Sequence, residues 1–287
     1  MSTTRKGLAV IGLAAAAILL QAGWAWAAVI PPVVWTDNFN SYTVGTAVNN
    51  QGGWNQSNNG TNYQIVANCV AGTNGVNYAP GVSKQLNWMG HPFAWSDLAI
   101  GNKIITRMDF QTDSNKQFDD DRTGWVTSGG LDNSSYHFAT QLDNTDGGGG
   151  GRIVTYWRDV YGAGNRVQNS IVSYAGLTLA STWYRSQLEI TKLGPTSARL
   201  DVNLWKLDAA GNTVDGPIAS GSIADTSTYA NPVPAGYFTA TTLYPMYKNY
   251  SIPGNCDNAY FEITPEPATL ALLAAGGVVA LLRRRHR

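Results

Sequence analysis

The sequence predicts an all-β protein, an antiparallel β-sandwich that lies between two apolar terminal segments. Apolar residues recur at every second position in several short runs of residues 28–264, as in strands with one face in a core. Glycine, proline, asparagine and aspartate separate these runs and mark turns. No stretch longer than about ten residues shows the i, i+3, i+4 spacing of a surface helix.

The first 27 residues have the pattern of a secretory signal peptide. Arg5 and Lys6 form a basic start, residues 7–20 are an uncharged apolar run, and Ala25-Trp26-Ala27 supplies small residues around a cleavage site. We therefore expect a signal helix that is cleaved after Ala27. An uncleaved membrane anchor is the alternative.

Alternation defines the strands of the middle segment. In residues 104–110 the side chains of Ile104, Met108 and Phe110 share one face, while Arg107 and Asp109 lie on the other. The same pattern recurs in residues 136–142, 187–191, 199–204 and 258–263. One apolar face per strand is typical of antiparallel sheets with one face in water. About a dozen such strands, spaced as they are here, predict one sandwich domain over residues 28–264.

Two local patterns sharpen the prediction of the fold. The first is Asp37–Tyr42 with Gly45 and Gln51–Trp54, and the second is Asp257–Phe261 near the other end. Together they resemble bacterial extracellular domains of the concanavalin A-like, laminin-G-like jelly-roll class. The resemblance implies an antiparallel jelly roll whose first and last strands lie side by side in one sheet.

The last 23 residues, 265–287, have three parts in a fixed order. Pro265-Glu266-Pro267 precedes an apolar segment without charge, which as a short helix is marginal for crossing a bilayer; Arg283, Arg284 and Arg285 follow it. This order resembles the PEP-CTERM sorting signal of Gram-negative bacteria. The resemblance implies transient anchoring in the inner membrane by the tail and processing by an exosortase-type membrane transpeptidase. A permanent membrane anchor is the alternative.

Composition excludes several classes of function. The formal net charge is zero, and about −5 without the two ends, which excludes a nucleic-acid binder held by phosphate contacts. Only Glu189 and Glu262 are glutamates of the exported segment, and neither belongs to a paired-carboxylate run such as a glycosidase needs. His91 and His137 have no partner at metal-ligand or triad spacing. The sequence therefore predicts a protein that is not an enzyme.

Calcium is the one metal that the sequence offers oxygen ligands for. Asp119, Asp120 and Asp121 form one oxygen-rich segment, and Asp143 and Asp146 belong to another. Hard cations take six to eight oxygen ligands, so these loop segments are candidates for binding calcium. Plain turn formation by Asp, Asn and Gly explains the same residues.

Aromatic and cysteine residues complete the candidates. Trp157 and Trp205 are the tryptophans we expect on an exposed face, where they would stack against sugar rings, whereas core packing is the alternative. Cys69 and Cys256 are the only cysteines, and in an oxidising compartment we expect them to form a disulfide.

These observations predict an exported, non-catalytic protein of the cell surface or extracellular matrix. The sorting signal implies an association with exopolysaccharide. Two alternatives stay open, namely a glycoside hydrolase or lyase on the same jelly-roll fold, and a structural coat or adhesion protein with no glycan ligand.

Overall fold

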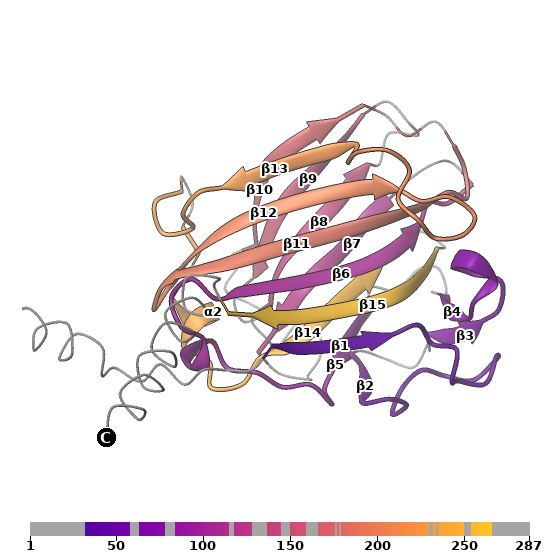
Figure 1. Cartoon of the computed structure of the whole chain (residues 1–287), viewed down its shortest axis with the longest axis horizontal. Coiled ribbons are helices and arrows are strands. Elements are labelled where there is room, and N and C mark those ends of the chain that lie inside the picture. Colours follow the sequence, from indigo (N-terminus) through magenta and orange to yellow (C-terminus); the bar gives the residue numbers. More distant parts are fainter. Residues whose placement is uncertain are drawn as a thin grey trace, which may run out of the picture.

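Two antiparallel sheets packed face to face form the protein in this computed structural model (Figure 1). The structure describes residues 32–265 except 58–62, 78–83, 115–117, 128–136, 145–149, 159–165, 176, 178, 230–231, 234 and 250–253. The expected signal peptide and nearly all of the tail, from Glu266 onward, lie outside these residues.

The larger sheet, called sheet A, has eight strands, and all its pairings are antiparallel. Its order is β13 (Ala219–Ile223), β12 (Ser197–Lys206), β11 (Trp183–Gly194), β6 (Lys103–Gln111), β15 (Asn255–Thr264), β4 (Gly75–Asn77) and β3 (Gln64–Val66), and β1 (Val33–Asp37) also pairs with β15.

The second sheet, called sheet B, has seven strands and is also antiparallel throughout. Its order is β10 (Arg166–Tyr174), β9 (Gly151–Arg158), β8 (His137–Asn144), β7 (Phe118–Val126), β14 (Tyr244–Asn249), β5 (Lys84–Trp88) and β2 (Trp54–Ser57). The predicted antiparallel sandwich is therefore confirmed.

Helical structure is confined to single turns in the described residues. These are η1 (Val70–Gly72), η2 (Trp95–Asp97) and α2 (Gly236–Thr239). Tyr237 and Phe238 of α2 are buried, and the ring of Phe238 lies 4.8 Å from that of Trp95, so this turn closes one end of the core.

One apolar core fills the space between the sheets, and tryptophans contribute much of it. Trp54, Trp88, Trp95 and Trp125 are each at most 2% exposed. The rings of Trp54 and Trp88 stack with their centroids 4.6 Å apart. For these four residues, core packing and not sugar stacking explains the aromatic side chain.

The first and last strands lie side by side, as the jelly-roll resemblance implies. Val33 to Asp37 of β1 pair with Ile263 to Ala259 of β15 (Figure 1). On its other side β15 pairs with β6, and a register shift between Asp257 and Tyr260 interrupts that ladder. Asn258 at this irregularity has φ = 51°, a left-handed conformation that Asn tolerates better than most residues.

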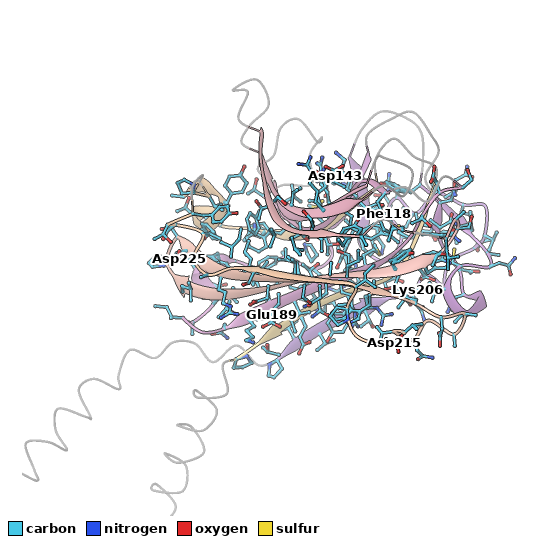
Figure 2. The ribbon with its side chains drawn as sticks, turned by 90° about the horizontal axis from the view of Figure 1, so that it is seen from above. Phe118, Asp143, Glu189, Lys206, Asp215 and Asp225 are labelled. Carbon is cyan, nitrogen blue, oxygen red and sulfur yellow. The ribbon has the colours of Figure 1, made fainter. Side chains whose placement is uncertain are left out.

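The outer faces of the sheets differ from the prediction that one face of each sheet is wet. Asp109 on the outer side of β6 is fully buried, and so are Ala139 and Gln141 on the outer side of β8. Alternation correctly separates the two faces of a strand, but it does not report what covers the face turned away from the core. The two layers are seen from above in Figure 2, with Asp143 on sheet B and Glu189 on the far side of sheet A.

Candidate functional site

A row of polar side chains crosses the outer face of sheet B, away from the apolar core. Lys248 on β14 pairs in register with Gln85 on β5 and with Arg122 on β7, and Arg122 pairs with Gln141 on β8. Asn87 follows two residues after Gln85 on the same face. We call these five residues the polar row.

The polar row is buried although it does not face the core. Gln85 and Asn87 are 0% exposed, Gln141 1%, Arg122 2% and Lys248 3%. Their neighbours along each strand, such as Leu86, Tyr247 and Leu142, belong to the core cluster between the sheets. Burying amides and charges costs free energy that apolar residues would not cost, so fold stability does not explain this row.

The hydrogen bond between Gln85 and Asn87 leaves one acceptor and one donor of the pair without a partner in the part of the chain that the structure describes. Nε2 of Gln85 donates to Oδ1 of Asn87 at 2.6 Å, while Oε1 of Gln85 and Nδ2 of Asn87 have no partner among the described residues. Reversing both amides would turn this bond around but would still leave one oxygen and one nitrogen available. Nε of Arg122 donates to Oε1 of Gln141 at 3.0 Å.

An apolar patch continues the same face. Val126, Ala139 and Met246 are fully buried in a cluster separate from the main core, with Tyr244 packed against it. Met246 pairs in register with Asn87, so the patch adjoins the polar row directly. A sugar ring presents hydroxyl groups at its edge and C–H groups on its face, and a polar row beside an apolar patch matches both.

Two local features of β7 bring the row together. A register shift between Asp119 and Asp121 precedes Arg122 in the ladder with β8. Gly124 allows the backbones of β7 and β8 to approach closely, since a Cβ atom there would lie 2.0 Å from the carbonyl oxygen of Phe138. Arg122 and Gln141 thereby face each other.

Sequence reasoning missed this row. A signal was present, because Gln85 and Asn87 alternate with Leu86 and Trp88 in the way a strand with one core face does. The sequence does not indicate that β5 and β14, far apart along the chain, lie beside β7.

The two predicted sugar-stacking tryptophans do not come together at this row. Trp205 is half-buried on the outer face of sheet A, where it pairs in register with Arg185. The side chain of Trp157, on β9 of sheet B, lies outside the described residues. Stacking of either ring on a glycan stays a prediction.

The predicted calcium ligands are divided between two faces and several partners. Asp119–Asp121 and Asp143 lie in strands β7 and β8 and not in loops. Asp119 and Asp143 are opposite each other in register, but Asp121 pairs with core-facing Leu142 and is buried. Asp143 forms an ion pair of 2.6 Å with Arg152. Asp146 and the side chains of Asp119 and Asp120 lie outside the described residues. Within the part described, no three His, Cys, Asp or Glu side chains converge on one point.

Cys69 and Cys256 are both buried and are free thiols in this structure. The expected disulfide between them stays a prediction. The Sγ atom of Cys69 and the carbonyl oxygen of Cys256 both lie against Gly75, where a Cβ atom would be 2.6 Å and 2.8 Å from them. Burial raises the pKa of Cys69 to about 12 and that of Cys256 well above its usual value.

The two glutamates share one row on the outer face of sheet A. Glu189 on β11 and Glu262 on β15 both pair in register with Ile105 on β6, two strand spacings or about 10 Å apart. Glu189 forms an ion pair of 2.5 Å with Lys103, and Glu262 accepts a hydrogen bond from the hydroxyl of Tyr260.

Comparison with known proteins identifies the tail. Residues 264–285 match the model of the PEP-CTERM protein-sorting motif, so the chain carries this sorting signal. No curated protein matches the sequence significantly. No helix within the described ranges is long and apolar enough to span a membrane.

Three solved structures are similar to this chain at low sequence identity. The globular domain of T. cruzi calreticulin is 8% identical and has a TM-score of 0.48, covering 88% of this chain and 95% of that one. An alginate lyase in complex with an alginate trisaccharide is 14% identical, with a TM-score of 0.44 and coverage of 81% and 98%. Lectin II from Ulex europaeus is 10% identical, with a TM-score of 0.41 and coverage of 81% and 99%.

Proposed function

We propose that this protein is an exported, non-catalytic glycan-binding protein of the cell surface or extracellular matrix, which associates with exopolysaccharide through the polar row of sheet B. One observation carries the proposal. Gln85 and Asn87 are fully buried on a face turned away from the core, and each keeps one polar atom without a partner in the described structure. A ligand hydroxyl can donate to Oε1 of Gln85 and accept from Nδ2 of Asn87 at once.

The sorting motif sets where this binding takes place. The PEP-CTERM motif at residues 264–285 implies export, recognition by an exosortase and processing at the membrane. A protein delivered in this way meets the polysaccharides that the cell secretes. The exopolysaccharide partner is therefore part of the proposal, supported by the compartment and by the chemistry of the polar row.

Binding without turnover is supported by the kind of groups in the polar row. Its five residues are amides and cations, and the neighbouring carboxylate of Asp143 is held by Arg152. The two glutamates lie on the other sheet, where Lys103 and Tyr260 engage them. Glycoside hydrolysis needs a free acid and a free base or nucleophile at the same bond.

Replacing Gln85 with Met and Asn87 with Leu tests the proposal. The double variant should lose at least about 10-fold in affinity for retained polysaccharides, because two hydrogen bonds to the ligand disappear. Its free energy of unfolding should stay the same or rise by about 1–2 kcal/mol, since a buried amide without a partner is destabilising. Binding is measured by retention on a panel of immobilised bacterial exopolysaccharides, and stability by urea unfolding.

Gln64→Met is the matched control, because Gln64 is exposed on β3 of the other sheet. It should retain full binding. Equal retention of the double variant and the control would place binding elsewhere, and absence of retention on every polysaccharide would favour a coat or adhesion protein. Release of reducing ends or of unsaturated products from the same panel would show an enzyme.

The sorting signal gives a separate prediction for the tail. Replacing Arg283, Arg284 and Arg285 with Ser should impair membrane retention and processing, because the positive residues that hold the end of the tail in the cytoplasm are removed. Intact-mass analysis of the protein from its host should show a wild-type product shortened near Pro265-Glu266-Pro267 and a variant that keeps the tail. A wild-type product that still carries the arginines at steady state would contradict the prediction.

A further inference from the structure

A cleft lies at the edge of sheet A, where β1 meets β15. It has a volume of about 620 Å³, within the range of small-molecule sites. Asp37, Tyr42 and His91 line one side, and Arg107, Asn258 and Tyr260 line the other. The polar row of sheet B contributes no residue to this cleft.

Arg107 is the residue of the cleft that is best placed to bind a ligand. Its guanidinium carbon lies 4.0 Å from the centre of the Tyr260 ring, a cation–π contact that fixes its orientation. The Nε atom is buried and has no hydrogen-bond partner among the described residues. Burial and the nearby charge of Arg185 lower the pKa of Arg107, and the charge of Asp109 partly opposes this change.

The carboxylates near Arg107 are already engaged. Asp109 is held by two hydrogen bonds of 2.8 Å from Arg185 and by one of 3.0 Å from Asn258. Glu262 accepts the hydroxyl of Tyr260. The described part of the chain contains no ion pair to Arg107. A guanidinium presents a planar set of donors that fits a carboxylate.

The opposite side of the cleft is built differently. Both oxygens of Asp37 accept hydrogen bonds, Oδ1 from the Phe39 N–H at 2.8 Å and Oδ2 from the Tyr42 hydroxyl at 2.5 Å and the Trp54 Nε1 at 2.7 Å. This rigid negative group disfavours a second carboxylate on its own side. Burial lowers the pKa of His91, so this side has no histidine cation at neutral pH.

Small hydroxyl and amide side chains also line the cleft, namely Thr36, Asn38 and Ser41. The cleft therefore has two guanidinium groups, of which Arg185 is already paired with Asp109 and Arg107 is not, together with hydroxyl and amide groups and the ring of Tyr42. A compact ligand with one carboxylate and several hydroxyl groups satisfies all of these groups. A neutral sugar would leave the Nε of Arg107 unpaired, and a dianion would approach Asp37.

We propose that this cleft binds a sugar acid, with its carboxylate on the guanidinium of Arg107 and its hydroxyl groups toward Thr36, Asn38 and Ser41. The site is separate from the polar row and does not depend on the function proposed for that row. Tyr260 and Asn258 act as positioning residues, because one supports the guanidinium and the other helps to keep Asp109 on Arg185.

Binding of glucuronate to the purified protein tests the inference by isothermal titration. Glucuronate should bind, and glucose and acetate should each bind at least about 10-fold more weakly, since each lacks one half of the recognised groups. Arg107→Gln should weaken glucuronate about 10- to 100-fold, the effect expected for lost hydrogen bonds to a charged group. Binding of glucose or acetate equal to that of glucuronate would overturn the assignment, and so would absence of glucuronate binding.

A second variant avoids any effect of Arg107 on folding. Ser41→Asp places a carboxylate at an exposed position of the cleft and should weaken glucuronate at least about 10-fold by repulsion, whereas Ser96→Asp, exposed on η2, should not. The Gln85→Met, Asn87→Leu variant should bind glucuronate like the wild type. Loss of glucuronate in that variant, with retention in Arg107→Gln and Ser41→Asp, would assign the sugar acid to sheet B and overturn the inference.

Discussion

Replacing Arg185 with Leu is expected to lower the free energy of unfolding by about 3–5 kcal/mol, the cost of leaving a buried charge without its partner. The carboxylate of Asp109 is completely buried on the outer face of sheet A. Arg185, on the neighbouring strand β11, donates one hydrogen bond to each carboxylate oxygen of Asp109. These hydrogen bonds raise the pKa of the Arg185 guanidinium. Without Arg185, Asn258 supplies the one remaining side-chain hydrogen bond to Asp109 among the described residues.

Urea unfolding at neutral pH measures the change, and Arg199→Leu is the matched control. Arg199 forms the same bidentate geometry with Asp201 on the same sheet, but its side chain is 52% exposed. An exposed ion pair contributes little to stability, so the control should lose much less than Arg185→Leu. The Asp109→Leu, Arg185→Leu double variant should recover most of the loss, because the buried charge is removed. Equal losses in Arg185→Leu and Arg199→Leu would contradict the prediction.

Asp109 also shows where prediction from sequence stops. The alternation of Ile104, Met108 and Phe110 correctly assigned the core face of β6, and all three side chains are fully buried. The same alternation placed Asp109 on a wet face, whereas it is buried. The covering groups come from β11 and β15, and a period of two within one strand contains no information about its neighbours.

The candidate site illustrates the same limit on a larger scale. The polar row joins β5, β14, β7 and β8, and β14 begins more than 150 residues after β5 ends. Each strand on its own shows only an ordinary alternation. Pairing of the first and last strands could be predicted, because the residues near both ends resemble a known class. The residues of β5 and β14 carried no comparable resemblance, so the central row was missed.

The sorting signal, by contrast, could be identified from sequence because it is a linear pattern. Pro265-Glu266-Pro267, an apolar segment and an arginine cluster are neighbours in the chain, and no folding is needed to bring them together. The matched motif at residues 264–285 confirms it. The sorting signal could therefore be predicted from the sequence alone. The polar row could be found only once the pairing register of the strands was known.

Stability should also fall as the pH rises through the range in which Asp257 titrates. Asp257 is completely buried, and burial raises its pKa from an ordinary value near 3.8 to about 7, although hydrogen bonds from Thr73 and from the Asn258 N–H partly oppose the change. Between these two pKa values the folded state binds more protons than the unfolded state. The contribution of this group is thus greatest below about pH 4 and is lost as the pH rises to about 8.

Asp257→Asn isolates this effect from other titrating groups. At about 1.4 kcal/mol for each unit of pKa, the wild type should lose up to about 4 kcal/mol relative to the variant between pH 4 and pH 8. The asparagine oxygen can still accept the Asn258 N–H, and its nitrogen can donate to the Thr73 hydroxyl, which itself donates to the carbonyl of Val70. The nearby Cys69 and Cys256 thiols stay protonated over this range because burial raises their pKa. Urea unfolding of both proteins at several pH values, with a reductant present, gives the two curves. Parallel curves would show that Asp257 does not titrate with a raised pKa, whereas a gap that widens with pH in favour of Asp257→Asn would confirm that it does.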